Sequence, residues 1–264
     1  MSSKRPKILI TNDDGIYAPG IKHLWTSLHE VDIGDLSIIA PLTERSGTGL
    51  SITSDRPLLV QNIKWPEKTP AWSVDGTPAD CVKMGMQVIL NHKPDFIFSG
   101  INAGSNAGRN VLYSGTIGAV IEGVLNGIPG IAFSCENIKS PNYTLAIKYI
   151  APLLHYLMKY PLPKGCLLNV NFPHNVKDKV KGFRLARQGK GRWAENPQLH
   201  LKVEEGLIYW LGNRAEELVE EEDSDVELLK QGYITVVPLH VEELTIKDEI
   251  HIRKSDFQKF FCDY

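Results

Sequence analysis

Two adjacent carboxylates, Asp13 and Asp14, follow an apolar run of strand-forming residues at positions 7–11 and precede Gly15. A buried parallel strand of an α/β protein often ends in this way, because functional groups gather at the carboxyl ends of the strands. The pair therefore predicts a metal site. The letters Asn-Asp-Asp-Gly are equally typical of a tight turn, since Asn and Asp bond to local backbone groups and Gly permits a positive φ. This stretch alone leaves both alternatives open.

A second polar loop favours the metal site over the turn. Residues 95–98 form another apolar strand, which runs into a loop rich in Gly, Asn and Ser. A helix is predicted from about residue 117 to residue 124, so Ser114 or Thr116 would lie at its N-terminus. Free N–H groups and the helix dipole favour an anion there. We therefore expect carboxylates for a cation and amides and hydroxyls for a phosphate at one edge of the sheet.

A third polar loop, residues 42–49, is expected at the same edge. It follows a strand predicted at residues 35–41, and a helix predicted at residues 21–30 separates that strand from the first. Strand, helix and strand over about thirty residues form a βαβ unit, which implies parallel strands with a right-handed crossover. In this loop Ser46 would offer a hydroxyl to a metal and Arg45 a charge to a substrate. A plain Ser/Gly turn is the simpler alternative.

The first 175 residues continue to alternate between strands and helices. Thr77 and Asp80 fit the N-cap and the acidic position of a capping box, so we expect Asp80 to be structural rather than catalytic. Further strands are predicted at residues 130–135 and 166–172, with an amphipathic helix between them. About five or six strands interleaved with helices predict an α/β fold with a three-layer, doubly wound, Rossmann-like and mostly parallel sheet. No G-x-G-x-x-G follows the first strand, which argues against a dinucleotide site.

Past residue 176 the sequence changes to short β-like segments. We expect a catalytic core at residues 1–175, a β-rich arm at residues 176–245 and a C-terminal segment at residues 246–264. The hairpins of the arm have no evident core of their own, so they are expected to dock on a second subunit. The last segment is expected to return to the core or to a subunit interface. An acidic run at residues 216–223 is interpreted as a solvated loop.

Composition limits the classes of partner. The 264 residues carry a formal net charge of -2 and contain no block of Lys and Arg, so duplex nucleic acid is not expected as a main partner. The first residues lack an apolar signal segment, and no apolar run approaches membrane-spanning length, which predicts a cytoplasmic protein. Four widely spaced cysteines are expected to be free, buried thiols rather than zinc ligands or a redox pair: Cys81, Cys135, Cys166 and Cys262.

Taken together, these motifs resemble the SurE family of survival proteins, which are metal-dependent acid phosphatases that act as nucleotidases. The resemblance covers nearly the whole chain, and several ordered motifs at compatible spacing are more specific than any single one. The motifs that carry it lie at residues 11–15, 45–47, 76–82, 99–104, 113–116, 169–173 and 231–233.

The resemblance implies a set of ligands and a substrate. The residues expected to hold one divalent cation per subunit, Mg²⁺ or Mn²⁺, are Asp13, Asp14, Ser46 and Asn102. The residues expected on the phosphate side are Asn106, Ser114, Gly115 and Thr116. The family fold is Rossmann-like with a C-terminal arm exchanged between subunits, which implies a homodimer or homotetramer. The implied substrates are nucleoside 5′- and 3′-monophosphates, and polyphosphate for some members.

Two mechanisms and one function without turnover remain open. Oxygen ligands suit a hard cation, which would help a water attack the phosphorus in line. The competing mechanism is an aspartyl-phosphate formed on Asp13 or Asp14. Outside enzymes, the alternative is a cation-dependent sensor that binds a nucleotide or phosphate. Among further residues, His240 is expected to be structural rather than a general acid, and Asp225 is a weak candidate for a contribution from the arm.

Overall fold

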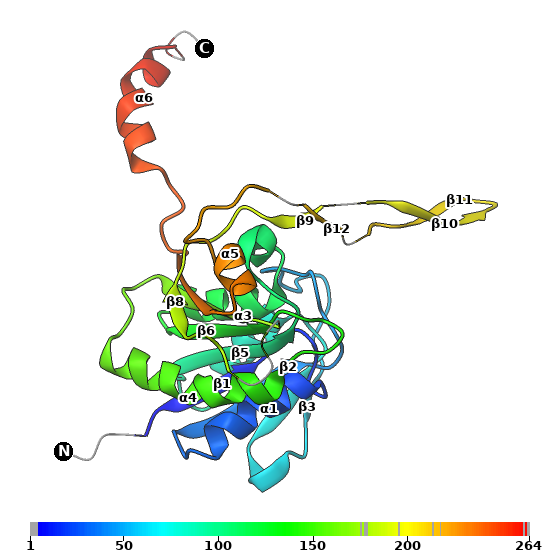
Figure 1. Cartoon of the computed structure of the whole chain (residues 1–264), viewed down its shortest axis with the longest axis vertical. Coiled ribbons are helices and arrows are strands. Elements are labelled where there is room, and N and C mark those ends of the chain that lie inside the picture. Colours follow the sequence, from blue (N-terminus) through cyan, green and yellow to red (C-terminus); the bar gives the residue numbers. More distant parts are fainter. Residues whose placement is uncertain are drawn as a thin grey trace.

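A central sheet of nine strands organises the chain, in the order β3-β4-β2-β1-β5-β6-β7-β13-β8 (Figure 1). The computed structural model describes residues 5–174, 176, 179–194, 196–212, 214–216, 218–260 and 262. The strands of the sheet are β1 (Lys7–Thr11), β2 (Asp35–Pro41), β3 (Val60–Asn62), β4 (Ala71–Val74), β5 (Phe96–Ala103), β6 (Gly130–Cys135), β7 (Cys166–Phe172), β8 (Phe183–Leu185) and β13 (Ile234–His240).

The middle of the sheet is parallel. Strands β4, β2, β1, β5, β6 and β7 run in the same direction, whereas β3 is antiparallel to β4 and β13 is antiparallel to β7. The carboxyl ends of β1, β2 and β5 therefore meet at one edge, and the polar loops predicted from the sequence follow these three ends.

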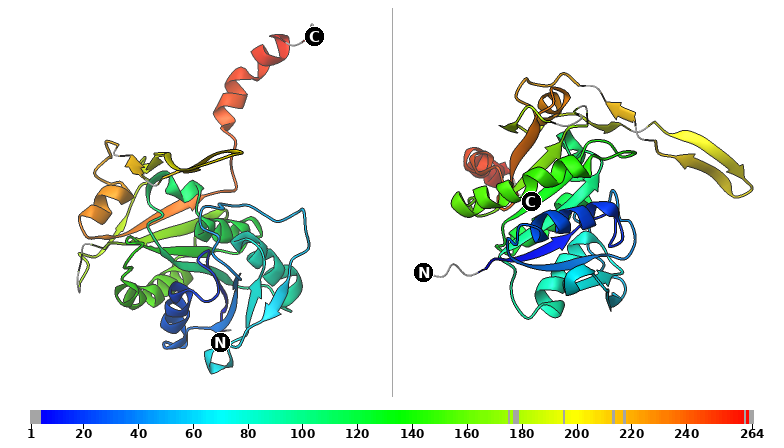
Figure 2. Two further views of the ribbon diagram at one scale, coloured as in Figure 1. Left: turned by 90° about the vertical axis from the view of Figure 1, so that its right-hand side faces the viewer. Right: turned by 60° about the horizontal axis from the view of Figure 1, so that its bottom comes forward.

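Helices cover both faces of the sheet (Figures 1 and 2). The helices of the core are α1 (Pro19–His29), α2 (Pro78–Met84), α3 (Gly115–Leu125) and α4 (Tyr143–Lys159), with short turns η1 (Pro66–Lys68), η2 (Gly85–Ile89) and η3 (Gly108–Leu112). Helices α1 and α4 contact each other on one face, and α2 and α3 do so on the other. Within β1, Ile8 and Ile10 pack in the hydrophobic core on the face of α1 and α4, and Leu9 packs in the core on the face of α2 and α3. Burial on both faces explains the unbroken apolar run of this strand, and the predicted three-layer α/β fold is confirmed.

The arm leaves the sheet after β8. Strand β9 (Arg192–Ala194) pairs with β12 (Arg214–Glu216), and β10 (Gln198–Val203) forms a hairpin with β11 (Gly206–Trp210). Figure 1 shows this hairpin extending far from the sheet. The predicted hairpin arm is therefore present, but its expected limits differ from the structure. Strands β8 and β13 lie within residues 176–245 and yet belong to the main sheet.

The C-terminal helix α6 (Lys247–Phe260) projects away from the sheet (Figure 2). All of its residues are exposed, so it does not make the expected return to the core. The alternative, a place at a subunit interface, stays a prediction. Within the part of the chain that the structure describes, no helix is both long enough and apolar enough to cross a membrane.

Candidate active site

A cavity of about 370 Å³ lies at the edge of the sheet where β1, β2 and β5 end. It brings together the loops after β1, β2 and β5, with Ile138 from the loop after β6. Six of the residues predicted for the site line this cavity: Asp13, Asp14, Ser46, Asn102, Asn106 and Ser114. The other two predicted residues, Gly115 and Thr116, lie behind Asp13 at the start of α3.

Asp13 is buried and is held by the first turn of α3. The hydroxyl of Thr116 donates to Asp13 Oδ1 at 2.5 Å. Burial raises the pKa of Asp13, whereas the hydrogen bonds from Thr116 lower it. A Cβ atom added to Gly115 would lie 2.8 Å from Asp13 Cβ. Only glycine therefore lets the helix N-terminus approach this carboxylate without displacing a neighbour.

Asp14 joins the end of β1 to the end of β5. The backbone N–H of Ala103 donates to Asp14 Oδ2 at 3.2 Å. Burial first, and then the negative charge of Asp13, raise the pKa of Asp14 to about 7. Glu44 also lines the cavity and adds negative charge next to both aspartates. Bringing these carboxylates together is electrostatically unfavourable unless protons or a cation neutralise them.

The donor set fits a hard divalent cation. Asn102 Nδ2 donates to the carbonyl of Gly104 at 2.8 Å, which leaves the amide oxygen of Asn102 as an acceptor. Ser46 adds a hydroxyl beside the two aspartates. Among the residues described, no group of three or more His, Cys, Asp and Glu is arranged for a metal ion. A cation here would depend on the Ser and Asn oxygens as well, a set that suits Mg²⁺ or Mn²⁺.

Asn106 is held on several sides by polar groups of the sheet. Its Nδ2 donates to Ser134 Oγ at 2.8 Å, and its backbone N–H donates to Asn171 Oδ1 at 2.8 Å. Its carbonyl accepts from Asn169 Nδ2 at 2.9 Å. Asn169 and Asn171 come from β7 and are fully buried. The sequence showed these two residues only as part of a motif, and the structure places them as supports of the loop that carries Asn106.

Ser114 caps α3 at the cavity. Its Oγ accepts from the backbone N–H of Ile117 at 3.2 Å, and the helix begins at Gly115, two residues before the predicted start. An α-helix leaves the first N–H groups without partners in the helix, and these carry the positive end of the dipole. The predicted anion-favouring helix N-terminus is thus placed beside the carboxylates. Thr116 is fully buried and positions Asp13 instead of lining the cavity.

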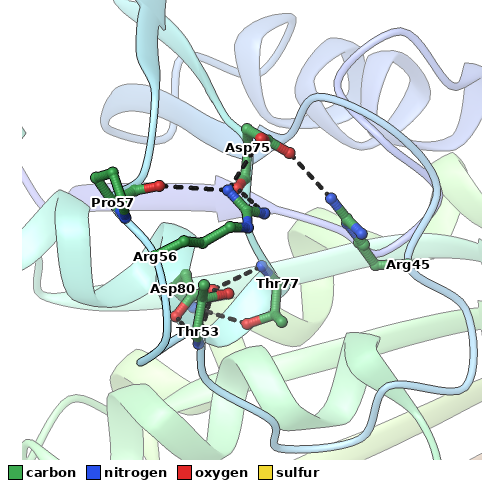
Figure 3. Close-up of polar contacts among 7 residues, drawn as sticks. All are labelled: Arg45, Thr53, Arg56, Pro57, Asp75, Thr77 and Asp80. Carbon is green, nitrogen blue, oxygen red and sulfur yellow. Dashed lines mark hydrogen bonds and ion pairs between the residues drawn. The ribbon is translucent and has the colours of Figure 1, made fainter.

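Arg45 and Asp80, which the sequence analysis considered for the site, bond to residues outside the cavity (Figure 3). The guanidinium of Arg45 donates to Asp75 Oδ1 at 3.0 Å, so its charge is directed to an acid of the protein rather than to a substrate. Asp80 completes the capping box with Thr77 and also accepts from the backbone and side chain of Thr53. The expected structural role of Asp80 is confirmed. The expected role of Arg45 is not supported.

Strand direction separates His240 from the cavity. His240 ends β13, which is antiparallel to β7, and it pairs with Cys166 at the beginning of β7. It therefore lies at the opposite edge of the sheet from the cavity of its own chain. Among the lining residues that the sequence did not predict, which include Asn110, Tyr113 and Ile138, only Glu44 is a carboxylate. The sequence did contain a signal for Glu44, since it is a third carboxylate in a loop already expected at the same edge of the sheet.

Comparison with known proteins gives a consistent result. The family profile described as "Survival protein SurE" matches residues 8–195. The 5′-nucleotidase SurE of Protochlamydia amoebophila is 48% identical, over 98% of this chain and 99% of its own. The 5′-nucleotidase SurE of Moorella thermoacetica is 39% identical, over 89% and 90%. The crystal structure of the SurE protein from Aquifex aeolicus aligns with a TM-score of 0.80 at 35% identity, and covers 95% of this chain and 100% of that one. The chain belongs to the SurE family.

Proposed function

We propose that this chain is a divalent-cation-dependent 5′-nucleotidase whose reaction takes place in the cavity at the carboxyl edge of the sheet. The observation that carries the proposal is the convergence of carboxylates, serine hydroxyls and side-chain amides on one cavity, at the N-terminus of a helix. Relatives that are named 5′-nucleotidases and align over nearly the full chain support the same reaction class.

The metal-binding side of the cavity consists of Asp13, Asp14, Ser46 and Asn102. These residues would hold one Mg²⁺ or Mn²⁺ ion. When bound, such an ion supplies electrophilic polarisation of the phosphoryl group and lowers the pKa of an attacking water. The protein contributes a fixed arrangement of donors, because Thr116 holds Asp13 and Ala103 holds Asp14 before any substrate enters.

The phosphate-binding side consists of Asn106, Ser114 and the first turn of α3. The Nδ2 of Asn106 carries two hydrogens, and one bond to Ser134 leaves the second for a phosphate oxygen. The dipole of α3 favours the negative charge of the phosphate. Charge on the phosphoryl oxygens is stabilised in the transition state of in-line attack by water. This arrangement needs no covalent intermediate on Asp13, whose Oδ1 already accepts from Thr116.

Activity on 3′-monophosphates and polyphosphate, and assembly into a homodimer or homotetramer through the arm, are further parts of the proposal. The hairpin β10–β11 carries exposed apolar side chains on both of its strands. Exposed apolar surface on an extended arm is typical of a segment that packs against another subunit.

Phosphate release from a panel of nucleoside monophosphates and an aryl phosphate tests the reaction. Chelator-treated protein is assayed with and without added Mg²⁺ or Mn²⁺, beside Asp14→Asn. The matched control is Asp95→Asn, the same chemical change at the residue before β5 and thus at the opposite edge of the sheet. We expect metal-dependent release by the wild type and the control, and none by Asp14→Asn. Metal-dependent nucleotide binding without release from any substrate would support the sensor and contradict the nucleotidase.

A further inference from the structure

Asp225 is a fully buried carboxylate at the start of α5 (Asp225–Lys230), away from the cavity. It accepts hydrogen bonds from the backbone N–H groups of Gly108 at 3.1 Å, Gly189 at 2.8 Å and Val226 at 2.9 Å. The Nε2 of Gln188 donates to it as well, at 2.9 Å. These donors satisfy the carboxylate oxygens of Asp225, whose burial would otherwise cost folding free energy.

These donors come from two segments, the base of the arm and the loop that carries Asn106. Gln188 and Gly189 lie at the base of the arm, between β8 and β9, whereas Gly108 lies two residues after Asn106. The side chain of Gln188 also donates to the carbonyl of Gly108. The carboxylate and its neighbour therefore hold the loop of residues 105–108 against the arm.

The same loop has tight contacts on both sides. Asn171 of β7 accepts from the backbone N–H of Asn106 and from the side chain of Ser105, at 2.8 and 3.2 Å. On the side of the arm, the backbone N–H of Arg109 donates to the carbonyl of Gly191 at 2.7 Å. A Cβ atom added to Gly108 would lie 2.2 Å from that carbonyl oxygen, and the φ of Gly108 is +61°. The loop is therefore fixed between the sheet and the base of the arm.

We propose that Asp225 is a positioning residue of the enzyme, which joins the base of the arm to the loop that presents Asn106 to the phosphate. Asp225 acts through Asn106 and does not touch the substrate. The inference rests on the proposed function, because its consequence is measured in the phosphatase reaction. It also gives the arm a role in the geometry of the site besides contact between subunits.

A double-mutant cycle tests this link. Asp225→Asn replaces one acceptor oxygen with an NH₂ group that faces N–H donors. The loop of residues 105–108 therefore loses hydrogen bonds that hold it to the base of the arm. We expect kcat to fall roughly tenfold or more, since a lost donor to transition-state charge costs up to about 10²–10³ in rate. Mn²⁺ affinity should stay within about twofold, because Asp13, Asp14 and Ser46 lie on other loops and Asn102 is held within β5, ahead of the loop of residues 105–108. In an Asn106→Ala background, Asp225→Asn should have little further effect on kcat.

The matched control is Glu227→Gln, the same type of change on the same helix. Glu227 pairs with Lys230, and the change should leave kcat unchanged. Should Asp225→Asn fail to fold, Gln188→Met removes the neighbouring donor to Gly108 and Asp225 and should lower kcat in the same non-additive way. Equal losses with and without Asn106, or an unchanged kcat in the folded variant, would overturn the inference. A wild type that releases no phosphate would instead overturn the proposed function.

Discussion

Thr116 donates its hydroxyl to Asp13 Oδ1 at 2.5 Å, although the two residues are 103 positions apart in the sequence. This bond fixes the end of β1 to the first turn of α3. The carboxylate proposed to bind the cation and the helix end proposed to bind the phosphate are thereby held in one geometry. The relative positions of cation and phosphate are then set before the substrate binds.

Removal of the Thr116 hydroxyl should weaken cation binding. Thr116→Val keeps the shape of the side chain but deletes the donor, so the buried carboxylate of Asp13 loses a bond that lowers its pKa. We expect roughly tenfold weaker Mn²⁺ binding, equivalent to about 1.4 kcal/mol, measured by calorimetry or electron paramagnetic resonance. Thr116→Ser, which retains the hydroxyl, is the control and should bind nearly as the wild type does. Equal affinities for all three proteins would show that the bond is irrelevant to the cation.

Cation binding should be coupled to proton release. The pKa of Asp14 without a cation is about 7, raised by burial and by Asp13, and only its ionised form is a ligand. Affinity for Mn²⁺ should therefore increase as the pH rises through about 7, and binding at pH 6 should release protons. Calorimetry in two buffers of different ionisation enthalpy measures this release. The part due to Asp14 should be lost in Asp14→Asn; release near zero at pH 6 in the wild type would contradict the assignment.

Asp80 should contribute stability at neutral pH that is lost in acid. Burial raises the pKa of Asp80, but hydrogen bonds from Thr53 and Thr77 outweigh this effect and leave the pKa below its usual value. A lowered folded-state pKa means that the contribution is present above the unfolded-state pKa of about 4 and disappears as the pH falls through the folded-state value. Asp80→Asn should reduce the free energy of unfolding by about 1–2 kcal/mol at pH 7.

Urea unfolding at several pH values measures this contribution. The difference between wild type and Asp80→Asn should shrink steadily below about pH 4. Asp55→Asn, which changes an exposed acid two residues after Thr53, should have little effect at any pH. A difference that does not depend on pH would show that the ionised carboxylate of Asp80 is not what stabilises the fold.

The hairpin should determine the size of the assembly. Leu199 and Tyr209 face each other across β10 and β11 and are about half exposed, at 46% and 53%. Changing both to Ser should lower the molar mass measured by light scattering, without unfolding the chain, because these side chains are not part of its core. Lys202→Ser on the same hairpin should leave the mass unchanged. An unaltered mass in the double variant would place the subunit contacts elsewhere.

Local patterns in the sequence were sufficient for the main strands and helices that border the cavity, although α3 begins two residues earlier than predicted. The apolar run before Asp13 and Asp14 is a strand buried on both faces, and Ser114 and Thr77 cap the helices that follow them. These features depend on residues within one turn or one strand, where backbone hydrogen bonding and side-chain periodicity act directly. The parallel order of the strands then places the carboxylates and the cap at a common edge.

The partners of individual side chains were decided by the tertiary structure. Arg45 turns to Asp75, Thr116 turns to Asp13, and Asp225 reaches a backbone N–H 117 positions away. His240 is remote from the cavity because β13 is antiparallel to β7, a direction that no local pattern specifies. Strand direction sets the position of the exposed His240, whereas burial decides the partners of Asp13, Thr116 and Asp225. Buried polar groups must find hydrogen-bond partners, and which partners are within reach depends on how distant segments pack.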